Sequence, residues 1–473
     1  MKTLLLLPAL ALVLTSCTET RVPTEPDPVP EDAQPQFDIT ASTPEYTTID
    51  LGTLGGSSSS VQTINEAGQV VGYSRTSSGE AHAFLWDGVM HDIGTLGGQL
   101  SEAWDVNEAG QVVGFSETPS TYPYHAFLWD GALHDLGTLG GSGSRATAIN
   151  DAGQVVGSAG TASGEDHAFL WDGTMHDLGT LGGEVSGASA INSAGQVAGT
   201  ATTASGQNHA FLWDGTMHDL GTLGGSWSYT QDMNEAGQVV GYSANASGDT
   251  RAFMWDGTMH DLGTVGGRWS HATAINDAGQ VAGWSTTASG QYHAFMWDGT
   301  MHDLGTLGGI FSWAYDINDA GQVVGEAYTG SGDQHAYVWD GAMHDLGTLG
   351  GRRSWAYAVN DVGEIVGYAH TAAGLQHATL WRPPLTPVQR LGQCAASVSA
   401  LEDEGVLNQG QANSLVTKID GAIVMLEADR TRPALNKLGA FQNEARAFVN
   451  GRKLSPEQGE ELISCVQGVI DAL

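Results

Sequence analysis

The segment HAFLWDGTMHDLGTLGG, residues 209–225, decides the fold because close copies of it fill the central part of the chain. Its first seven residues, or a variant of them, occur eight times, 43 residues apart once and 42 residues apart thereafter. These copies begin at His82, His125, His167, His209, Arg251, His293, His335 and His377. The strings DLGTLGG and INEAGQVVG also recur eight times each, so a unit of 42 residues is the building block of this region.

Each unit predicts four short strands joined by tight turns. In residues 101–141 the expected strands are 103–107, 111–116, 126–129 and 133–139. Asn-Glu-Ala-Gly at 107–110 is typical of a type I turn closed by a left-handed glycine, and Asp130-Gly131 predicts a two-residue hairpin turn. The third and fourth strands are apolar on both faces. Each sheet therefore needs cover on both faces, and radially stacked sheets provide it.

The repeat predicts a mainly β fold, an eight-bladed β-propeller over residues 46–382. The first strand of this region, 47–51, is a lone fourth strand, and the last, 378–381, is a third strand with no fourth strand after it. The N-terminal strand is therefore expected to complete the eighth blade and to close the ring without a free edge. An open β-solenoid is the alternative, and it does not need complementary ends.

The repeat resembles the HAF-repeat family of bacterial extracellular proteins, which is named for the string His-Ala-Phe. The resemblance covers residues 46–382 approximately, and it rests on motifs that occur eight times. The family has no assigned activity, so the resemblance implies an architecture and an extracellular location rather than a chemistry.

Residues 388–473 lack the Gly-rich repeats and show helical periodicity, which predicts a four-helix accessory module. Ser455-Pro456-Glu457-Gln458 is typical of a capping box at the start of the last helix. Cys394 and Cys465 fall in the first and last of these helices and are expected to form a disulfide in an oxidising compartment. The string LNQGQANSLVTKI resembles FIMAH-like modules of secreted bacterial proteins, which implies an attachment role.

The N-terminal residues 1–16 are typical of a signal peptide, because Lys2 precedes an apolar run too short to span a bilayer. Leu14-Thr15-Ser16-Cys17 resembles the bacterial lipobox, which implies diacylation of Cys17 and cleavage before it. A chance cysteine at this point is the alternative. The Pro-rich residues 17–45 predict an extended stalk. We therefore expect a protein of the bacterial cell envelope, in the outer membrane or at the cell surface, that contacts the membrane only through lipid.

The acidic composition argues against a nucleic-acid partner, because 53 Asp and Glu residues face only 17 Lys and Arg residues, for a formal net charge of −36. The 16 His residues fall mostly on repeated positions. The expected hairpin register places His91 opposite Phe84 and diagonal to His82. Repetition in nearly every unit favours a structural role over weak metal sites or catalysis. We predict no catalytic residue, no metal ligand and no cofactor, and none of the common catalytic motifs is present.

Comparison of the units with one another points to a binding face. The connections between units and those between second and third strands vary most, and both emerge at the same end of a blade. Aromatic and cationic residues gather in the connections between units or at the start of the next strand, and we expect them to bind ligand in an arc near the channel mouth. They are Trp227, Trp269, Trp313, Trp355, Tyr315, Tyr357, Arg268, Arg352 and Arg353. The alternative is that the aromatic residues plug the channel mouth or pack between blades.

The predicted function is that of a cell-surface lipoprotein with a non-catalytic binding propeller, whose ligand is a polysaccharide or a surface protein. A carbohydrate-active enzyme, a lyase or a glycosidase on the same scaffold, is the alternative.

Overall fold

A computed structural model describes residues 46–119 and 124–473. The predicted signal peptide 1–16, the lipidation site Cys17 and the stalk 17–45 lie outside the described residues. Within those residues, no helix is both long enough and apolar enough to cross a membrane.

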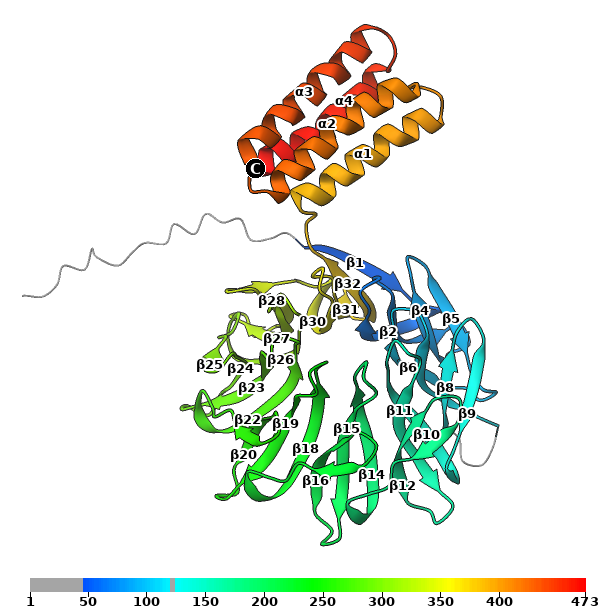
Figure 1. Ribbon diagram of the computed structural model, residues 1–473, viewed down its shortest axis with the longest axis vertical. Helices are drawn as coiled ribbons and strands as arrows, with labels where there is room; N and C mark the ends of the chain where they lie inside the picture. Colours follow the sequence, from blue (N-terminus) through cyan, green and yellow to red (C-terminus); the bar gives the residue numbers. More distant parts are fainter. Residues whose placement is uncertain (1–45, 120–123) are drawn as a thin grey trace, which may run out of the picture. The chain divides into compact units, whose positions relative to one another are not determined.

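The strands between Thr47 and Arg382 form four-stranded antiparallel units that follow one another along the chain (Figure 1). Units 1 to 4 contain β2 (Gly55–Ile64), β3 (Val70–Thr76), β4 (Ala81–Trp86), β5 (Met90–Gly94); β6 (Ser101–Val106), β7 (Val112–Glu117), β8 (Tyr124–Trp129), β9 (Leu133–Gly137); β10 (Gly140–Ile149), β11 (Val155–Thr161), β12 (Asp166–Trp171), β13 (Met175–Asp177); β14 (Gly182–Ile191), β15 (Val197–Thr203), β16 (Asn208–Trp213), β17 (Met217–Asp219).

Units 5 to 8 continue the same order, except that the last unit takes its fourth strand from the other end of the repeat region. They contain β18 (Gly224–Met233), β19 (Val239–Asn245), β20 (Thr250–Trp255), β21 (Met259–Asp261); β22 (Gly266–Ile275), β23 (Val281–Thr287), β24 (Tyr292–Trp297), β25 (Met301–Asp303); β26 (Gly308–Ile317), β27 (Val323–Thr329), β28 (Gln334–Trp339), β29 (Met343–Asp345); β30 (Gly350–Val359), β31 (Ile365–Thr371), β32 (Gln376–Arg382) and β1 (Thr47–Gly52). A single parallel bridge between Gln334 and Arg353 joins the sheets of units 7 and 8.

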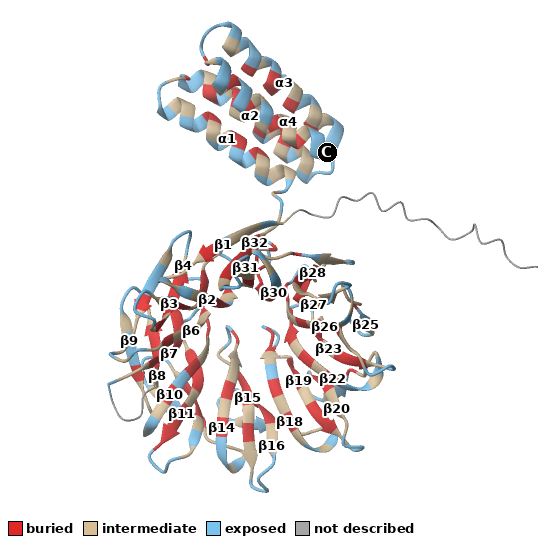
Figure 2. Cartoon of the chain, turned by 180° about the vertical axis from the view of Figure 1, so that it is seen from behind, coloured by how far each residue is buried: buried red, intermediate tan, exposed pale blue. Residues whose placement is uncertain are grey.

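The hydrophobic core lies between neighbouring sheets, as the buried strand centres in Figure 2 show. Phe127 of unit 2 is fully buried against Val71 and Leu85 of unit 1, whereas Leu128 on the opposite face packs toward unit 3. Each sheet is therefore covered on both faces. The prediction of a mainly β fold built from four-stranded, blade-like sheets is confirmed.

The two ends of the repeat region meet in unit 8. β1 pairs antiparallel with β32, with Ile49 opposite Leu380, and β2 of unit 1 packs against β32. The backbone N–H of Ala378 donates to Ser59 Oγ at 2.8 Å, the same bond that links each earlier unit to the next. The N-terminal strand thus pairs with the last strand as the sequence predicts, and contacts between units run in a closed circuit.

One register prediction is wrong. Trp129 pairs with Leu133, so the hairpin turn has three residues, 130–132, rather than two, and Gly131 adopts a φ of 104°. The extra residue shifts the fourth strand by one position, which exchanges its two faces. In unit 1 this shift places His91 opposite Leu85, not opposite Phe84.

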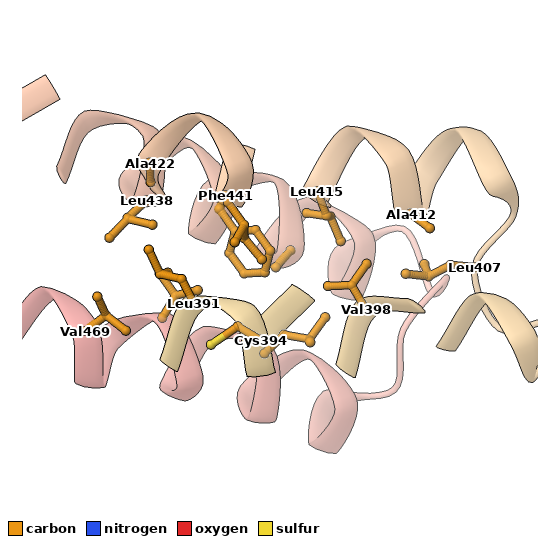
Figure 3. Close-up of a cluster of buried hydrophobic side chains, with 14 of the residues drawn as sticks. Leu391, Cys394, Val398, Leu407, Ala412, Leu415, Ala422, Leu438, Phe441 and Val469 are labelled. Carbon is orange, nitrogen blue, oxygen red and sulfur yellow. The ribbon is translucent and has the colours of Figure 1, made fainter. Parts of the chain in front are cut away.

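The C-terminal part consists of α1 (Pro387–Asp403), α2 (Gln409–Glu427), α3 (Thr431–Asn450) and α4 (Pro456–Ala472). Capping boxes start α1, α2 and α4, and the one at Ser455 is the box that the sequence predicts. Leu391, Leu415, Phe441 and Val469, one from each helix, are fully buried in one core (Figure 3). Cys394 and Cys465 form the predicted disulfide between α1 and α4. A small C-terminal helical part is therefore confirmed.

Candidate ligand-binding site

The repeated histidines join the third and fourth strands of the sheets. In unit 1, His82 Nδ1 lies 2.9 Å from Asp92 Oδ1, and His91 Nε2 lies 2.8 Å from Asp87 Oδ1. Equivalent pairs recur around the sheets, and His377 pairs with Asp50 of the N-terminal strand. These carboxylate partners support a structural role for the histidines. Over residues 46–119 and 124–473, no group of three or more His, Cys, Asp or Glu side chains is arranged to hold a metal ion.

A row of variable side chains runs between the first and second strands of the units. In each unit the residue after the repeated serine of the first strand lies opposite one residue of the second strand, and we call these two residues the seam pair. From unit 1 to unit 8 the seam pairs are Ser60–Tyr73, Glu102–Phe115, Arg145–Ser158, Gly187–Thr200, Tyr229–Tyr242, His271–Trp284, Trp313–Glu326 and Trp355–Tyr368.

Seam pairs also contact one another across units. Tyr242 of unit 5 stacks on His271 of unit 6 with ring centroids 4.1 Å apart, and the Arg145 guanidinium of unit 3 lies 5.1 Å from the Phe115 ring centroid of unit 2. The second member of one pair therefore faces the first member of the next pair. Side chains at these positions form a row that passes from sheet to sheet.

From Tyr229 in unit 5 to Trp313 in unit 7 this row is aromatic. Starting at Tyr229, each ring contacts the next through Tyr242, His271, Trp284 and Tyr292, with centroid separations between 4.0 and 5.4 Å. Tyr292 then stacks on Trp313 at 6.1 Å. We call the aromatic belt the following set, which adds the flanking rings: Trp227, Tyr229, Tyr242, His271, Trp284, Tyr292, Phe311, Trp313 and Tyr328.

The belt is partly exposed and carries little charge. Its rings are half-buried, and burial lowers the pKa of His271 to about 4. His271 is therefore neutral at pH 7 and acts as a flat ring between Tyr242 and Trp284. A continuous surface of ring edges and faces results.

A second aromatic group lies beside Glu326, which is the only carboxylate among the second-strand residues of the seam pairs. Glu326 is 6% exposed, accepts a hydrogen bond from Tyr315 Oη at 2.6 Å and another from the Gln334 amide. Tyr315 contacts Tyr357, and Tyr357 contacts Tyr368, which lies against Trp355.

The environment of Glu326 changes its acidity. Burial raises its pKa to about 7, although the hydrogen bonds from Tyr315 and Gln334 and the charge of Arg353 act in the opposite direction. Burial and the nearby Glu326 carboxylate also hold the pKa of Tyr315 far above its usual value. Glu326 is thus a weak acid near neutrality inside a ring of aromatic side chains.

Six of the nine predicted site residues fall into two groups. Trp227 and Trp313 belong to the belt, whereas Tyr315, Tyr357 and Trp355 belong to the aromatic group beside Glu326, on which the charge of Arg353 also acts. Trp269 is 44% exposed and contacts no other ring among the described residues. Arg268 and Arg352 pair with the protein's own Asp249 and Asp333 at 2.6 and 2.7 Å. All four tryptophans lie on first strands, not in the connections before them.

Sequence reasoning missed Glu326, Tyr242 and Trp284. All three stand on second strands at the position opposite the seam residue of the first strand. Aligning the eight units on the string GQVVG shows that this position varies, with Glu326 as its only acidic residue. The same comparison that selected the tryptophans would have found these residues.

No protein-family model matches the chain, and no curated protein matches its sequence. Solved structures share local similarity at low identity. A puromycin-hydrolyzing peptidase from Mycobacterium tuberculosis has a TM-score of 0.42 at 13% identity, covering 69% of this chain and 60% of the peptidase. A fucose-recognising lectin from Aleuria aurantia with a six-bladed β-propeller fold has a TM-score of 0.28 at 12% identity, covering 65% and 99%. The SapL1 lectin, solved with α-methyl fucoside, has a TM-score of 0.27 at 9% identity, covering 71% and 99%. Scores this low do not establish a common fold.

Proposed function

We propose that the protein is a closed eight-bladed propeller that binds polysaccharide without turnover, through the aromatic belt of units 5 to 7. The observation that carries this proposal is the unbroken row of half-exposed rings from Tyr229 to Trp313. Sugar rings present apolar C–H faces that stack on aromatic side chains, and large rigid aromatic residues are frequent anchors of binding sites.

The length of the belt favours a polymer over a single sugar. The rings extend over the first and second strands of three successive units, so several sugar residues of one chain find an aromatic contact. A net charge of −36 favours a neutral glycan, because an acidic polymer is repelled at low ionic strength. A surface protein is the other class of partner, and the binding test below distinguishes it.

One observation favours a second candidate, a carbohydrate-active enzyme. Glu326 has a pKa raised to about 7 by burial, which suits a general acid in glycoside cleavage. A general acid must reach the glycosidic oxygen of the substrate. Glu326 is only 6% exposed, and its two carboxylate oxygens already accept hydrogen bonds from Tyr315 and Gln334. We therefore place binding first.

We further propose that the chain is a HAF-repeat lipoprotein of the bacterial envelope, held at Cys17 by lipid, with the four helices as an accessory module. The lipobox-like residues 14–17 and the Pro-rich segment after them support this location. A Cys17→Ser variant is expected to lose membrane association. If a mature-length Cys17→Ser chain still sediments with membranes, the anchor lies elsewhere.

The binding proposal is tested by affinity electrophoresis of the full chain in gels that contain arabinoxylan, galactomannan, mixed-linkage β-glucan, dextran or alginate. We expect at least one neutral polymer to retard the protein. The double variant Trp227→Ala/Trp313→Ala should weaken that binding by ~1–4 kcal/mol, about fivefold to a thousandfold, because it removes two anchors of the belt.

Trp104→Ala is the matched control, since Trp104 lies on the first strand of unit 2 and outside the belt. It should bind like the wild type. Release of reducing ends or unsaturated sugars from a retained polymer would favour the enzyme. Absence of retardation by every polymer would contradict the proposal and direct attention to a protein partner.

A further inference from the structure

The row of seam pairs is interrupted in units 3 and 4. Ser158, Gly187 and Thr200 occupy positions that are aromatic in units 5 and 6. Two hollows of about 220 and 350 Å³ lie here, and both are lined by Ser158 and Asp166. We call the two hollows together the polar cleft. The first hollow is slightly smaller than a typical small-molecule site, about 300–1,000 Å³, and the second falls within that range.

The side walls of the polar cleft are held in place by ring contacts and a hydrogen bond at its two ends. At one end the Arg145 guanidinium lies over the rings of Phe115 and Tyr124, at 5.1 and 5.3 Å from their centroids. At the other end Tyr229 stacks on Tyr242, and its hydroxyl accepts a hydrogen bond from the Asn208 amide at 2.7 Å. Tyr229 is therefore both the first ring of the belt and a wall of the cleft.

Several polar groups of the cleft make neither an ion pair nor a side-chain hydrogen bond within the described residues. Arg145 and Asp166 both line the first hollow, yet neither makes an ion pair or a side-chain hydrogen bond within residues 46–119 and 124–473. The same holds in those residues for the hydroxyls of Ser142, Ser158 and Ser189. The cleft thus offers a cationic donor, an anionic acceptor and three hydroxyls to whatever fills it.

The opposite charges select the class of ligand. A free anion gains from Arg145 but is repelled by Asp166, and a metal cation experiences the reverse. A neutral polyol satisfies both, because each hydroxyl group donates one hydrogen bond and accepts others. Adjacent hydroxyls on a sugar ring match a donor and an acceptor that line the same hollow.

We propose that the polar cleft binds one neutral sugar residue, recognised through its hydroxyls by Arg145 and Asp166 and bounded by Tyr124 and Tyr229. The choice of ligand class rests on the proposed function, because a glycan lying on the belt reaches the cleft at Tyr229. The cleft is nevertheless a separate site with its own residues. It recognises an individual sugar, whereas the belt holds the polymer.

Gly187→Trp is the sharpest variant for a test. A Cβ at Gly187 meets only Ser158 Cβ, at 3.9 Å, and the backbone there is not left-handed. The equivalent position holds Trp313 and Trp355 in units 7 and 8, so the strand accepts this side chain. The indole is expected to fill the cleft and leave the fold intact.

Binding is measured by saturation-transfer NMR on the full chain with the methyl glycosides of glucose, galactose, mannose, xylose, fucose and glucuronic acid. We expect at least one neutral glycoside to give a signal, and Gly187→Trp to abolish it. Asp166→Asn, which keeps the shape and removes the charge, should weaken it at least tenfold. If Gly187→Trp fails to fold by thermal unfolding, the Asp166→Asn result decides.

Trp313→Ala separates the two sites. It should weaken polymer retention and leave the glycoside signal unchanged. A glycoside signal without polymer binding would support the sugar site in the cleft and contradict polymer binding by the belt. Polymer binding without a glycoside signal would contradict the sugar site in the cleft. The proposal is overturned if no neutral glycoside binds the wild type, if only the glucuronide binds, or if a folded Gly187→Trp chain binds as well as the wild type.

Discussion

We call the seam pairs of units 5 to 7 the filled seam and those of units 3 and 4 the open seam. The two share one backbone arrangement but present different surfaces. Gly187 and Thr200 in unit 4 occupy the register positions of Tyr229 and Tyr242 in unit 5. One seam is filled by stacked rings, and the other holds a hollow whose lining includes Ser158, Asp166 and Ser189, side chains without a hydrogen bond among the described residues. Side chains alone make the difference, so one repeat supplies two kinds of surface.

The fold tolerates this difference because other positions hold the sheets together. Ser186 and Ser228 are both buried and accept the backbone N–H of Ala168 and Ala210, at 2.8 and 2.9 Å. Phe211 and Phe253 are both fully buried between sheets. These repeated positions are nearly uniform, whereas the seam pairs are free to change.

Deleting residues 46–56 should have the largest effect, because it breaks the circuit on which both seams depend. The deletion removes β1, the partner of β32, and Asp50, the partner of His377. Exposed edges of unit 8 should lower the free energy of unfolding by far more than the ~1 kcal/mol of a typical point mutation. Urea unfolding measures the loss.

The control deletes residues 22–32, before the described part of the chain, and should leave the unfolding midpoint unchanged. Equal losses from the two deletions would mean that β1 does not close the structure.

The repeat made much of the fold predictable. Strand positions followed from motif spacing, and the complementary ends, 47–51 and 378–381, predicted their pairing. The register of the third and fourth strands did not follow, because Asp130-Gly131 suits both two-residue and three-residue turns. Only the observed pairing of Trp129 with Leu133 distinguishes these turns.

The site was predictable in part. The tryptophans stood out by residue type, and three of them lie in aromatic groups. Their partners come from several strands of the same or a neighbouring sheet, such as Tyr242 on β19 and Tyr292 on β24. Sequence order does not place Tyr242 beside His271. Nor does it reveal Glu326 as buried, because burial depends on rings contributed by unit 8. The polar cleft could not be predicted from the sequence, because serine and glycine residues are common in every unit and do not by themselves indicate a hollow.

Trp313→Ala should have the next largest effect on stability, because it removes a half-buried ring from the filled seam. We expect a loss of about 3 kcal/mol in the free energy of unfolding, at the low end for buried aromatic residues. Urea unfolding of this variant beside Trp104→Ala, its control, shows whether the belt is stabilised as one row. A loss greater than about 5 kcal/mol would identify Trp313 as a core residue rather than a surface anchor.

Glu326 makes the filled seam sensitive to pH. Its pKa is raised to about 7 in the folded chain from a reference of 4.5, so the folded state binds this proton more tightly than the unfolded state. The contribution of Glu326 to the free energy of unfolding therefore falls as pH rises from about 4.5 through 7. Between pH 5.5 and 8 we expect a loss of about 2 kcal/mol from Glu326.

Glu326→Gln should remove that part of the pH dependence. Thermal unfolding at the two pH values, compared between variant and wild type, isolates it, because buried Asp105 and Asp232 titrate in both proteins. An unchanged pH dependence in Glu326→Gln would show that the carboxyl group is not perturbed by its surroundings.

Gly187→Trp should have the smallest effect on stability, within about 1 kcal/mol in either direction, because it fills space without displacing backbone. It makes the open seam resemble the filled one. A large destabilisation in urea unfolding would mean that the two seams are not interchangeable.

Hydroxyl-radical footprinting of the full chain, with and without a retained polysaccharide, tests the central claim most directly. Mass spectrometry then reports the oxidation of each aromatic residue. The account predicts that the polymer protects Trp227, Trp284 and Trp313 in the belt and leaves Trp104 in unit 2 as reactive as before. Protection of Trp104 with no change at the three belt residues would contradict it.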